Sequence, residues 1–192
     1  MTPEHALIVA WALWIASWLA AALWAAPAAK RPARGAEWLY RIVTLAGAFL
    51  LFSAFRHPQY GREVLWVPGD AAGWTLVAIA VLGFAFTWWA RIRLGRLWSS
   101  SVTRKEDHHV VDTGPYAIVR HPIYTGIIAA VFATAVLKGI LIGILGALLI
   151  TLGFWIKARL EERFLREQLG PDVYDAYRRR VPMLIPFGPK SA

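Results

Sequence analysis

The chain has 192 residues, and 58% of them are hydrophobic, well above the roughly 45–50% typical of soluble domains. Its 21 basic and 12 acidic residues give a formal net charge of +9. In so apolar a chain this excess is expected from Lys and Arg retained in cytoplasmic loops, so we set nucleic-acid binding aside. The absence of cysteine excludes thiolate nucleophiles, cysteine-ligated metals and disulfides.

Three apolar segments in the first half are predicted to cross a membrane, which takes roughly 20 residues for a hydrocarbon core about 30 Å thick. Residues 6–26 carry no charge, and Glu4 and His5 stand where a signal peptide has Lys or Arg. Residues 42–55 form a shorter span, extended by the aromatic residues and the arginine that precede it. Residues 71–90 form the third, which ends in two tryptophans before an arginine, the order expected at a membrane interface.

Residues 122–156 are apolar except for Lys138, and one straight helix of that length would reach roughly 52 Å, too long for the bilayer. The break is predicted at Lys138–Gly139, which gives a helical hairpin with arms at 122–137 and 139–156. Small residues in membrane helices allow close packing. The arms are therefore expected to approach closely at Gly139, Gly143 and Gly146.

The distribution of basic residues predicts the orientation of these five spans. Residues 30–41, 91–120 and 157–190 hold 18 of the 21 Lys and Arg residues, and the other three are Arg56, Arg62 and Lys138. Because cytoplasmic loops retain Lys and Arg, the N-terminus is predicted outside and the C-terminus in the cytoplasm. The expected fold is an all-α polytopic membrane protein, and cleavage of the first span would leave four spans in the same orientation.

The loop before the hairpin and the C-terminal tail share the predicted cytoplasmic face, where a site is expected. Gly114–Pro115 marks a turn, and Pro122 suits the first turn of a helix. That helix would present its positive end next to Arg120, His121 and Tyr124.

The tail is predicted to continue the last span as an amphipathic helix that stops at Gly170–Pro171. Its apolar face holds Ile156, Leu160, Phe164 and Leu165. The polar face carries three opposite-charge pairs four residues apart, which favours a solvated face: Lys157/Glu161, Glu162/Arg166 and Arg163/Glu167. A last short helix would place Tyr174, Tyr177 and Val181 on one face and Arg178–Arg180 near anionic headgroups.

Other patterns are weaker guides to function. All five histidines fall in loops or at span ends, so neither a metal nor a haem site is expected. Trp11, Trp14 and Trp18 share a helix face that would meet lipid or a second copy of the chain. The more ordinary alternative is that they are interfacial and packing tryptophans. The oligomeric state is not predicted.

The motifs of the second half resemble the isoprenylcysteine carboxyl methyltransferase family and, more loosely, the phospholipid methyltransferases. The resemblance covers roughly residues 100–187 and comprises Gly114-Pro115-Tyr116, Val119-Arg120-His121-Pro122-Ile123-Tyr124-Thr125-Gly126, a hairpin, Glu161-Glu162, Gly170, Tyr174, Tyr177, Arg178, Arg180, Val181, Pro182 and Pro186. It implies three N-terminal spans in residues 1–99 and a methyltransferase core in residues 100–192, integrated into one domain.

The resemblance also implies S-adenosylmethionine as the cofactor and a lipophilic methyl acceptor, most simply a carboxylate of the isoprenylcysteine type. Carried over by position, the cofactor-binding residues are His108, His109, Val110, Val111, Gly114, Tyr116, His121, Pro122, Ile123, Tyr124 and Glu161. Arg120 and Glu162 are the expected catalytic residues. Lys157 is expected to bind the substrate, as a point charge where eukaryotic members have an arginine.

The residues are compatible with this chemistry, and alternatives remain. A sulfonium donor with an amino-acid tail needs a carboxylate for its ammonium group and aromatic surfaces for its adenine and sulfur, which Glu161, Tyr116 and Tyr124 would supply. A carboxylate acceptor needs no general base, whereas an amine or hydroxyl acceptor would need one, His121 or Glu162. The alternatives are a phospholipid or other small-lipid methyltransferase, a non-enzymatic scaffold or transporter subunit, and a haem or quinone protein.

Overall fold

The computed structural model describes residues 1–23, 35–53, 64–95, 98 and 110–190. These residues form helices and connecting segments, and they contain no β-strand beyond one isolated bridge between Val64 and Ile140. The helices, in chain order, are α1 (Pro3–Ala22), α2 (Gly35–Ser53), α3 (Asp70–Leu94), α4 (Pro115–Ile118), α5 (Pro122–Lys138), α6 (Leu141–Leu169) and α7 (Pro171–Arg180).

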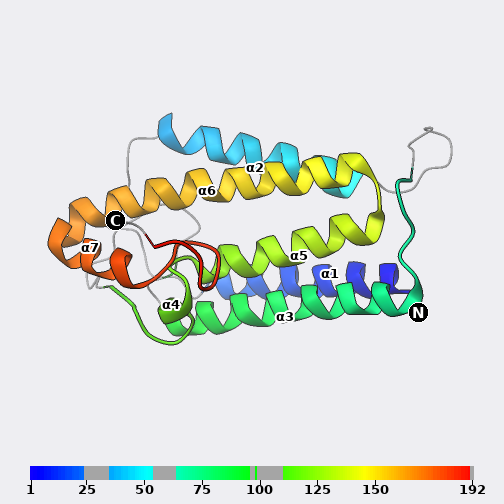
Figure 1. Ribbon diagram of the computed structural model, residues 1–192, viewed down its shortest axis with the longest axis horizontal. Coiled ribbons are helices and arrows are strands. Elements are labelled where there is room, and N and C mark those ends of the chain that lie inside the picture. Colours follow the sequence, from blue (N-terminus) through cyan, green and yellow to red (C-terminus); the bar gives the residue numbers. More distant parts are fainter. Residues whose placement is uncertain (24–34, 54–63, 96–97, 99–109, 191–192) are drawn as a thin grey trace.

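The five long helices lie side by side as an elongated bundle (Figure 1). Helix α2 packs along α6, while α3 packs along α5 and α1 packs against α3. Helices α5 and α6 form the expected antiparallel hairpin, and α7 folds back against the end of α6. The start of α5 therefore lies at the same end of the bundle as the end of α6.

The hairpin turns at the predicted place. Helix α5 ends at Lys138, and Gly139 follows with φ +61°, in the left-handed region where glycine carries no steric penalty. A Cβ atom on Gly139 would also collide with the carbonyl oxygen of Trp66, in the segment that precedes α3. The predicted stop at Gly170–Pro171 is confirmed as well, because α6 ends at Leu169 and α7 begins at Pro171.

Glycines set the closest approaches between helices, although one of the predicted glycine contacts is wrong. Gly146 faces α2 and not the other arm of the hairpin: a Cβ atom on it would lie 2.7 Å from the carbonyl oxygen of Gly47. Gly83 of α3 and Gly126 of α5 face each other in the same way, and a Cβ on Gly83 would lie 2.5 Å from the Gly126 carbonyl oxygen. Two helix pairs thus rest on backbone-to-backbone packing, as is common in membrane bundles.

Within the described part of the chain, three helices are long and apolar enough to cross a membrane: α1, α3 and α6. Helix α5 is a shorter apolar helix of 17 residues. Together with the family described below, these helices identify an integral membrane protein. The count of five crossings, which adds α2 and α5, and the orientation of the termini stay predictions.

The tryptophans of α1 pack inside the bundle. The indole N–H of Trp11 donates to the Thr134 hydroxyl of α5 at 2.9 Å, and that of Trp14 donates to the Thr87 hydroxyl of α3 at 2.8 Å. The Trp14 and Trp18 rings stack with centroids 5.0 Å apart. Membrane interiors offer an indole N–H no water, so these bonds fix the rotation of α1. The packing interpretation is confirmed for these contacts, and a lipid-facing or dimer face stays a prediction.

The Gly83–Gly126 contact predicts a large effect of a single side chain. Gly126→Val places carbon atoms against the Gly83 carbonyl group, so α3 and α5 must separate. We expect a loss of about 1–3 kcal/mol or more, the usual range for overpacking, measured as a lower midpoint of thermal unfolding in detergent. Gly69→Ala is the control, since its Cβ would meet nothing within 4 Å. Equal midpoints for the two variants would contradict the close contact.

Candidate functional site

A buried group of polar side chains lies where the start of α5 meets the second half of α6. Arg120 and His121 immediately precede α5, and Glu161 and Glu162 lie on α6, past the apolar part of that helix. The hairpin brings the two pairs together although about 40 residues separate them along the chain. Arg120, His121 and Glu162 are each at most 9% exposed.

Arg120 and Glu162 form the innermost ion pair. The Nε atom of Arg120 donates to Oε1 of Glu162 at 2.7 Å, and their side chains are 1% and 6% exposed. The Nη1 atom of Arg120 donates to the carbonyl oxygens of Val181 at 2.5 Å and Arg178 at 3.1 Å. A buried ion pair is tolerated only when its remaining donors and acceptors are satisfied, and here the end of α7 supplies the acceptors.

His121 lies between the two carboxylates. Its Nε2 atom is 3.2 Å from Oε1 of Glu162, and its Nδ1 atom is 3.5 Å from Oε2 of Glu161. Burial alone would lower the pKa of His121, but the hydrogen bonds and negative charges of the two glutamates outweigh it and raise the pKa above its ordinary value. The arrangement favours the imidazolium form, which donates from both ring nitrogens.

Glu161 is the more accessible carboxylate, with 18% of its side chain exposed. The Tyr124 hydroxyl lies 2.7 Å and 2.8 Å from its two oxygens, and the Lys157 ammonium is 3.9 Å from Oε1. The Tyr124 ring stacks between His121, at a centroid distance of 5.3 Å, and Phe154, at 4.8 Å. Glu161 thus combines a partly open carboxylate with an aromatic wall.

The C-terminal segment closes this end of the bundle, and its role was not predicted. The backbone N–H groups of Arg120 and His121 donate to the carbonyl oxygens of Pro182, at 2.9 Å, and Met183, at 3.1 Å. The Thr125 hydroxyl donates to the carbonyl oxygen of Leu184 at 2.6 Å. The prolines after α7 would have been the available signal, because they stop the helix and leave extended backbone to pair with another segment.

The loop residues expected to bind a cofactor surround this cluster. Tyr116 on α4 is buried against Tyr124 and Ile123, with Val111 packed beside them. Its carbonyl oxygen accepts a hydrogen bond from the Tyr177 hydroxyl at 2.7 Å. Val110 packs against the aromatic residues of α7, Pro122 is buried at the start of α5, and Gly114 caps α4 at φ +61°. His108 and His109 lie outside the described residues.

The expectation of a solvated charged face on α6 is wrong at its most important position. Glu162 points inward to Arg120, and Arg166, its expected partner one turn on, instead forms an ion pair with Asp175 of α7 at 2.9 Å. The predicted Lys157/Glu161 pair is present, but both members belong to the cluster, and Lys157 is only 9% exposed. Tertiary partners have replaced the helical neighbours.

Arg91, near the end of α3, is a buried charge that sequence reasoning assigned to the membrane interface. It is 1% exposed and donates to the carbonyl oxygens of Gly95 at 2.7 Å and Ala21 at 2.8 Å. Its guanidinium lies 4.3 Å from the centre of the Trp98 ring. Arg91 thus joins the ends of α1 and α3 next to the loop residues of the cluster.

Comparisons with known proteins point to one family. Residues 75–167 match the isoprenylcysteine carboxyl methyltransferase (ICMT) family. Protein-S-isoprenylcysteine O-methyltransferase B of Arabidopsis thaliana is 30% identical over 136 residues, covering 67% of this chain and 68% of the plant protein. The Schizosaccharomyces pombe protein-S-isoprenylcysteine O-methyltransferase is 35% identical over 106 residues, covering 52% of this chain and 43% of its own length.

A third relative is named for a different substrate. Methanethiol S-methyltransferase of Pseudomonas sp. (strain GM41(2012)) is 29% identical over 152 residues, covering 75% of this chain and 56% of that protein. The chain therefore spans between about two fifths and two thirds of the length of these three relatives. The family match includes α4, α5 and Glu161–Glu162 but stops before α7 and the segment that closes the cluster.

The Arg120–Glu162 pair predicts a stability test. Arg120→Ala leaves the Glu162 carboxylate buried without its nearest cation, so we expect a loss of about 3–5 kcal/mol in equilibrium unfolding in mild detergent. Arg166→Ala removes the exposed pair with Asp175 and should cost less than about 1 kcal/mol. Similar losses for the two variants would show that Arg120 is not a central contact.

Proposed function

The chain belongs to the isoprenylcysteine carboxyl methyltransferase family and is a membrane methyltransferase, and we propose that it transfers the methyl group of S-adenosylmethionine to a lipophilic acceptor. The observation that carries the choice of cofactor site is the partly open Glu161 carboxylate, held between Tyr124, His121 and Lys157. Its charge is fixed in place by these partners, and 18% of its side chain is exposed.

The residues around Glu161 fit the chemistry of this cofactor. Glu161 is placed to bind the ammonium group of the amino-acid tail, because a charge-assisted hydrogen bond is stronger than a neutral one. The Tyr124 and Tyr116 rings offer electron-rich faces for the positive sulfur and the adenine. When bound, S-adenosylmethionine supplies an electrophilic methyl carbon on a sulfonium sulfur. The residues expected on the loop, from Val110 to Tyr124, close the same end of the bundle.

We assign Arg120 and Glu162 a positioning role in place of direct contact with the acceptor. Both side chains are almost fully buried, and Arg120 makes its hydrogen bonds to Glu162 and to backbone carbonyls. Their effect on the reaction is to hold His121 and, through it, Glu161 in one orientation. Precise placement of reacting groups is itself a large part of catalysis in a displacement reaction.

Lys157 is the candidate contact for an acceptor carboxylate. Its ammonium lies beside the Tyr124 and Tyr40 rings, 5.2 Å and 5.6 Å from their centroids, at the junction of α2 and α6. A carboxylate acceptor is a nucleophile without losing a proton, so it needs orientation and a counter-charge but no base. This chemistry matches an acceptor of the isoprenylcysteine type, and the surrounding helices give its lipid tail access from the membrane.

A small thiol is the second candidate acceptor, favoured by the methanethiol S-methyltransferase relative. A thiol must lose its proton to become a good nucleophile. His121, as an imidazolium held between two carboxylates, supplies a positive charge that favours the thiolate form of such an acceptor. The two candidates therefore differ in which residue matters, Lys157 for a carboxylate and His121 for a thiol.

The cofactor site is tested by calorimetric titration of the purified protein with S-adenosylmethionine. We expect micromolar binding by the wild type and at least a hundredfold loss in Glu161→Ala, because the ammonium group loses its counter-charge. Glu167→Ala, an exposed glutamate on the same helix, should bind normally. Normal binding of S-adenosylmethionine by folded Glu161→Ala would contradict the proposed site. If the folded wild type in lipid nanodiscs does not bind S-adenosylmethionine, the proposed cofactor is wrong.

The acceptor is tested by transfer of radiolabelled methyl from S-adenosylmethionine to N-acetyl-S-farnesylcysteine, methanethiol and phosphatidylethanolamine. We expect the prenylcysteine carboxylate to be methylated fastest, with Lys157→Gln raising its KM at least tenfold and leaving cofactor affinity within about twofold. Arg159→Gln, an exposed cation two residues further along α6, is the control. Faster methylation of methanethiol, with no effect of Lys157→Gln, would favour the thiol reaction.

A further inference from the structure

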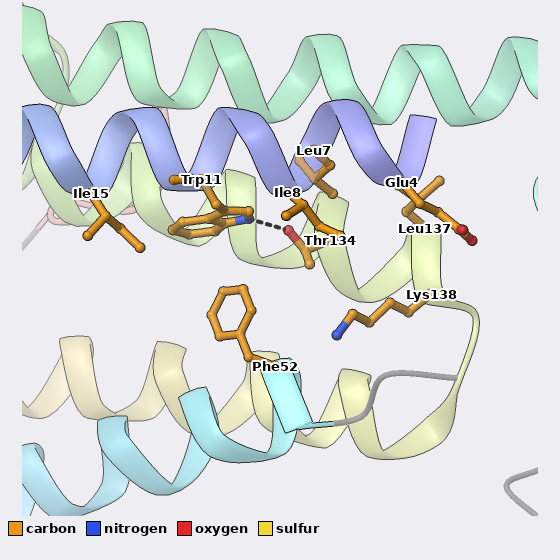
Figure 2. A pocket seen from close by; sticks show the side chains of 10 residues that line it. Glu4, Leu7, Ile8, Trp11, Ile15, Phe52, Thr134, Leu137 and Lys138 are labelled. Atoms are coloured by element: carbon orange, nitrogen blue, oxygen red, sulfur yellow. Dashed lines mark hydrogen bonds between the residues drawn. The ribbon is translucent and has the colours of Figure 1, made fainter. Parts of the chain in front are cut away.

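A second feature lies at the opposite end of α5 from the candidate site. A pocket of about 440 Å³ opens between α1 and the ends of α2 and α5 (Figure 2). Its walls are mostly hydrocarbon, contributed by Leu7, Ile8, Trp11, Ile15, Phe52 and Leu137. The volume falls in the range of small-molecule sites, about 300–1,000 Å³.

The pocket is separate from the cluster around Glu161. Helix α5 begins beside the cluster, at Pro122, and ends at the pocket, at Lys138. Its 17 residues span about 25 Å at 1.5 Å per residue. A ligand in this pocket is therefore neither the bound cofactor nor the reacting end of the acceptor.

The polar groups of Trp11 and Thr134, in the middle of the pocket, are paired with the protein. The Trp11 indole N–H donates to the Thr134 hydroxyl, which in turn donates to the carbonyl oxygen of Ala130 at 2.7 Å (Figure 2). The Trp11 and Phe52 rings meet edge to face at 5.3 Å and form the back of the pocket. Such a surface offers little to water, and apolar cavities are filled by apolar ligands.

The pocket has one charged end and one apolar end. Glu4 and Lys138 lie toward one end, on opposite walls, and Ile15 lies at the other end (Figure 2). The α1 stretch from Glu4 to Ile15 is about 16 Å long, close to the hydrocarbon thickness of one leaflet, about 15 Å. Ile8 and Ile15 are 50% and 45% exposed, so the long side is open to the membrane interior.

We propose that this pocket binds one zwitterionic phospholipid, with an acyl chain along α1, its phosphate at Lys138 and its ammonium at Glu4. The Lys138 ammonium donates to the Leu51 carbonyl oxygen, and its positive charge attracts a phosphate as well. Opposite charges at one end of an apolar slot complement a headgroup that carries both signs. The lipid comes from the leaflet at the α5–α6 turn, and the proposal is independent of the methyltransferase reaction.

The proposal is tested by native mass spectrometry of the protein released from nanodiscs of equimolar phosphatidylethanolamine and phosphatidylglycerol. We expect the wild type to retain one phosphatidylethanolamine molecule. Ala12→Trp and Ile15→Trp, which fill the pocket from α1, should each retain at least tenfold less. Leu13→Trp, on the opposite face of α1 and 66% exposed, is the matched control and should retain the lipid.

Headgroup recognition is tested in the same mixture with Glu4→Gln, which should bind both lipids equally because the counter-charge for the ammonium is gone. Retention of the lipid by both pocket-filling variants, or equal retention of the two lipids by the wild type, would overturn the proposal. Cofactor titration of Ala12→Trp and Ile15→Trp checks that each is folded and should match the wild type. A failed lipid test therefore remains distinguishable from a failed cofactor site.

Discussion

The Glu162 carboxylate, buried at the edge of a membrane bundle, is the constraint on which the candidate site depends. Its charge is tolerated because Arg120 donates to it at 2.7 Å and His121 lies 3.2 Å away. Those partners come from the segment before α5. Arg120 also donates to the carbonyl oxygens of Arg178 and Val181, at the end of α7. One charge therefore holds together three segments that are distant in sequence.

That charge can be placed only because the hairpin has a fixed geometry. Gly139 turns α5 into α6, and glycine contacts then bring α2 against α6 and α3 against α5. In lipid, helices gain little from the hydrophobic effect on packing together, so close backbone contact and interhelical hydrogen bonds carry more of the stability. The Trp11–Thr134 and Trp14–Thr87 bonds add such links between α1 and its neighbours. A rigid apolar bundle is thus the support for a polar site at one end.

The sequence predicts the features that are local, and it misses those that depend on tertiary contacts. The turn at Gly139 and the stop at Gly170 follow from helix length and from glycine and proline chemistry, and both are confirmed. The family motifs also identify Glu161, His121 and Tyr124, which the structure brings together. The partner of Glu162 could not be predicted, because Arg166 stands at ideal helical spacing whereas Arg120 is 42 residues away. The burial of Arg91 could not be predicted either, because one of its two acceptors, the Ala21 carbonyl oxygen, lies 70 residues away on α1.

Helix α5 connects two surfaces that suit ligands of opposite polarity. At its start, His121 and Tyr124 help to hold an accessible carboxylate, which suits a charged donor arriving from water. At its end, Leu137 and Lys138 border an apolar slot with charge at one end, which suits an amphiphile that stays in the membrane. Between these two surfaces α5 packs tightly on α3 through Gly126. The two surfaces therefore share a helix but not a ligand, so a side chain that fills the apolar slot is not expected to change what the charged end binds.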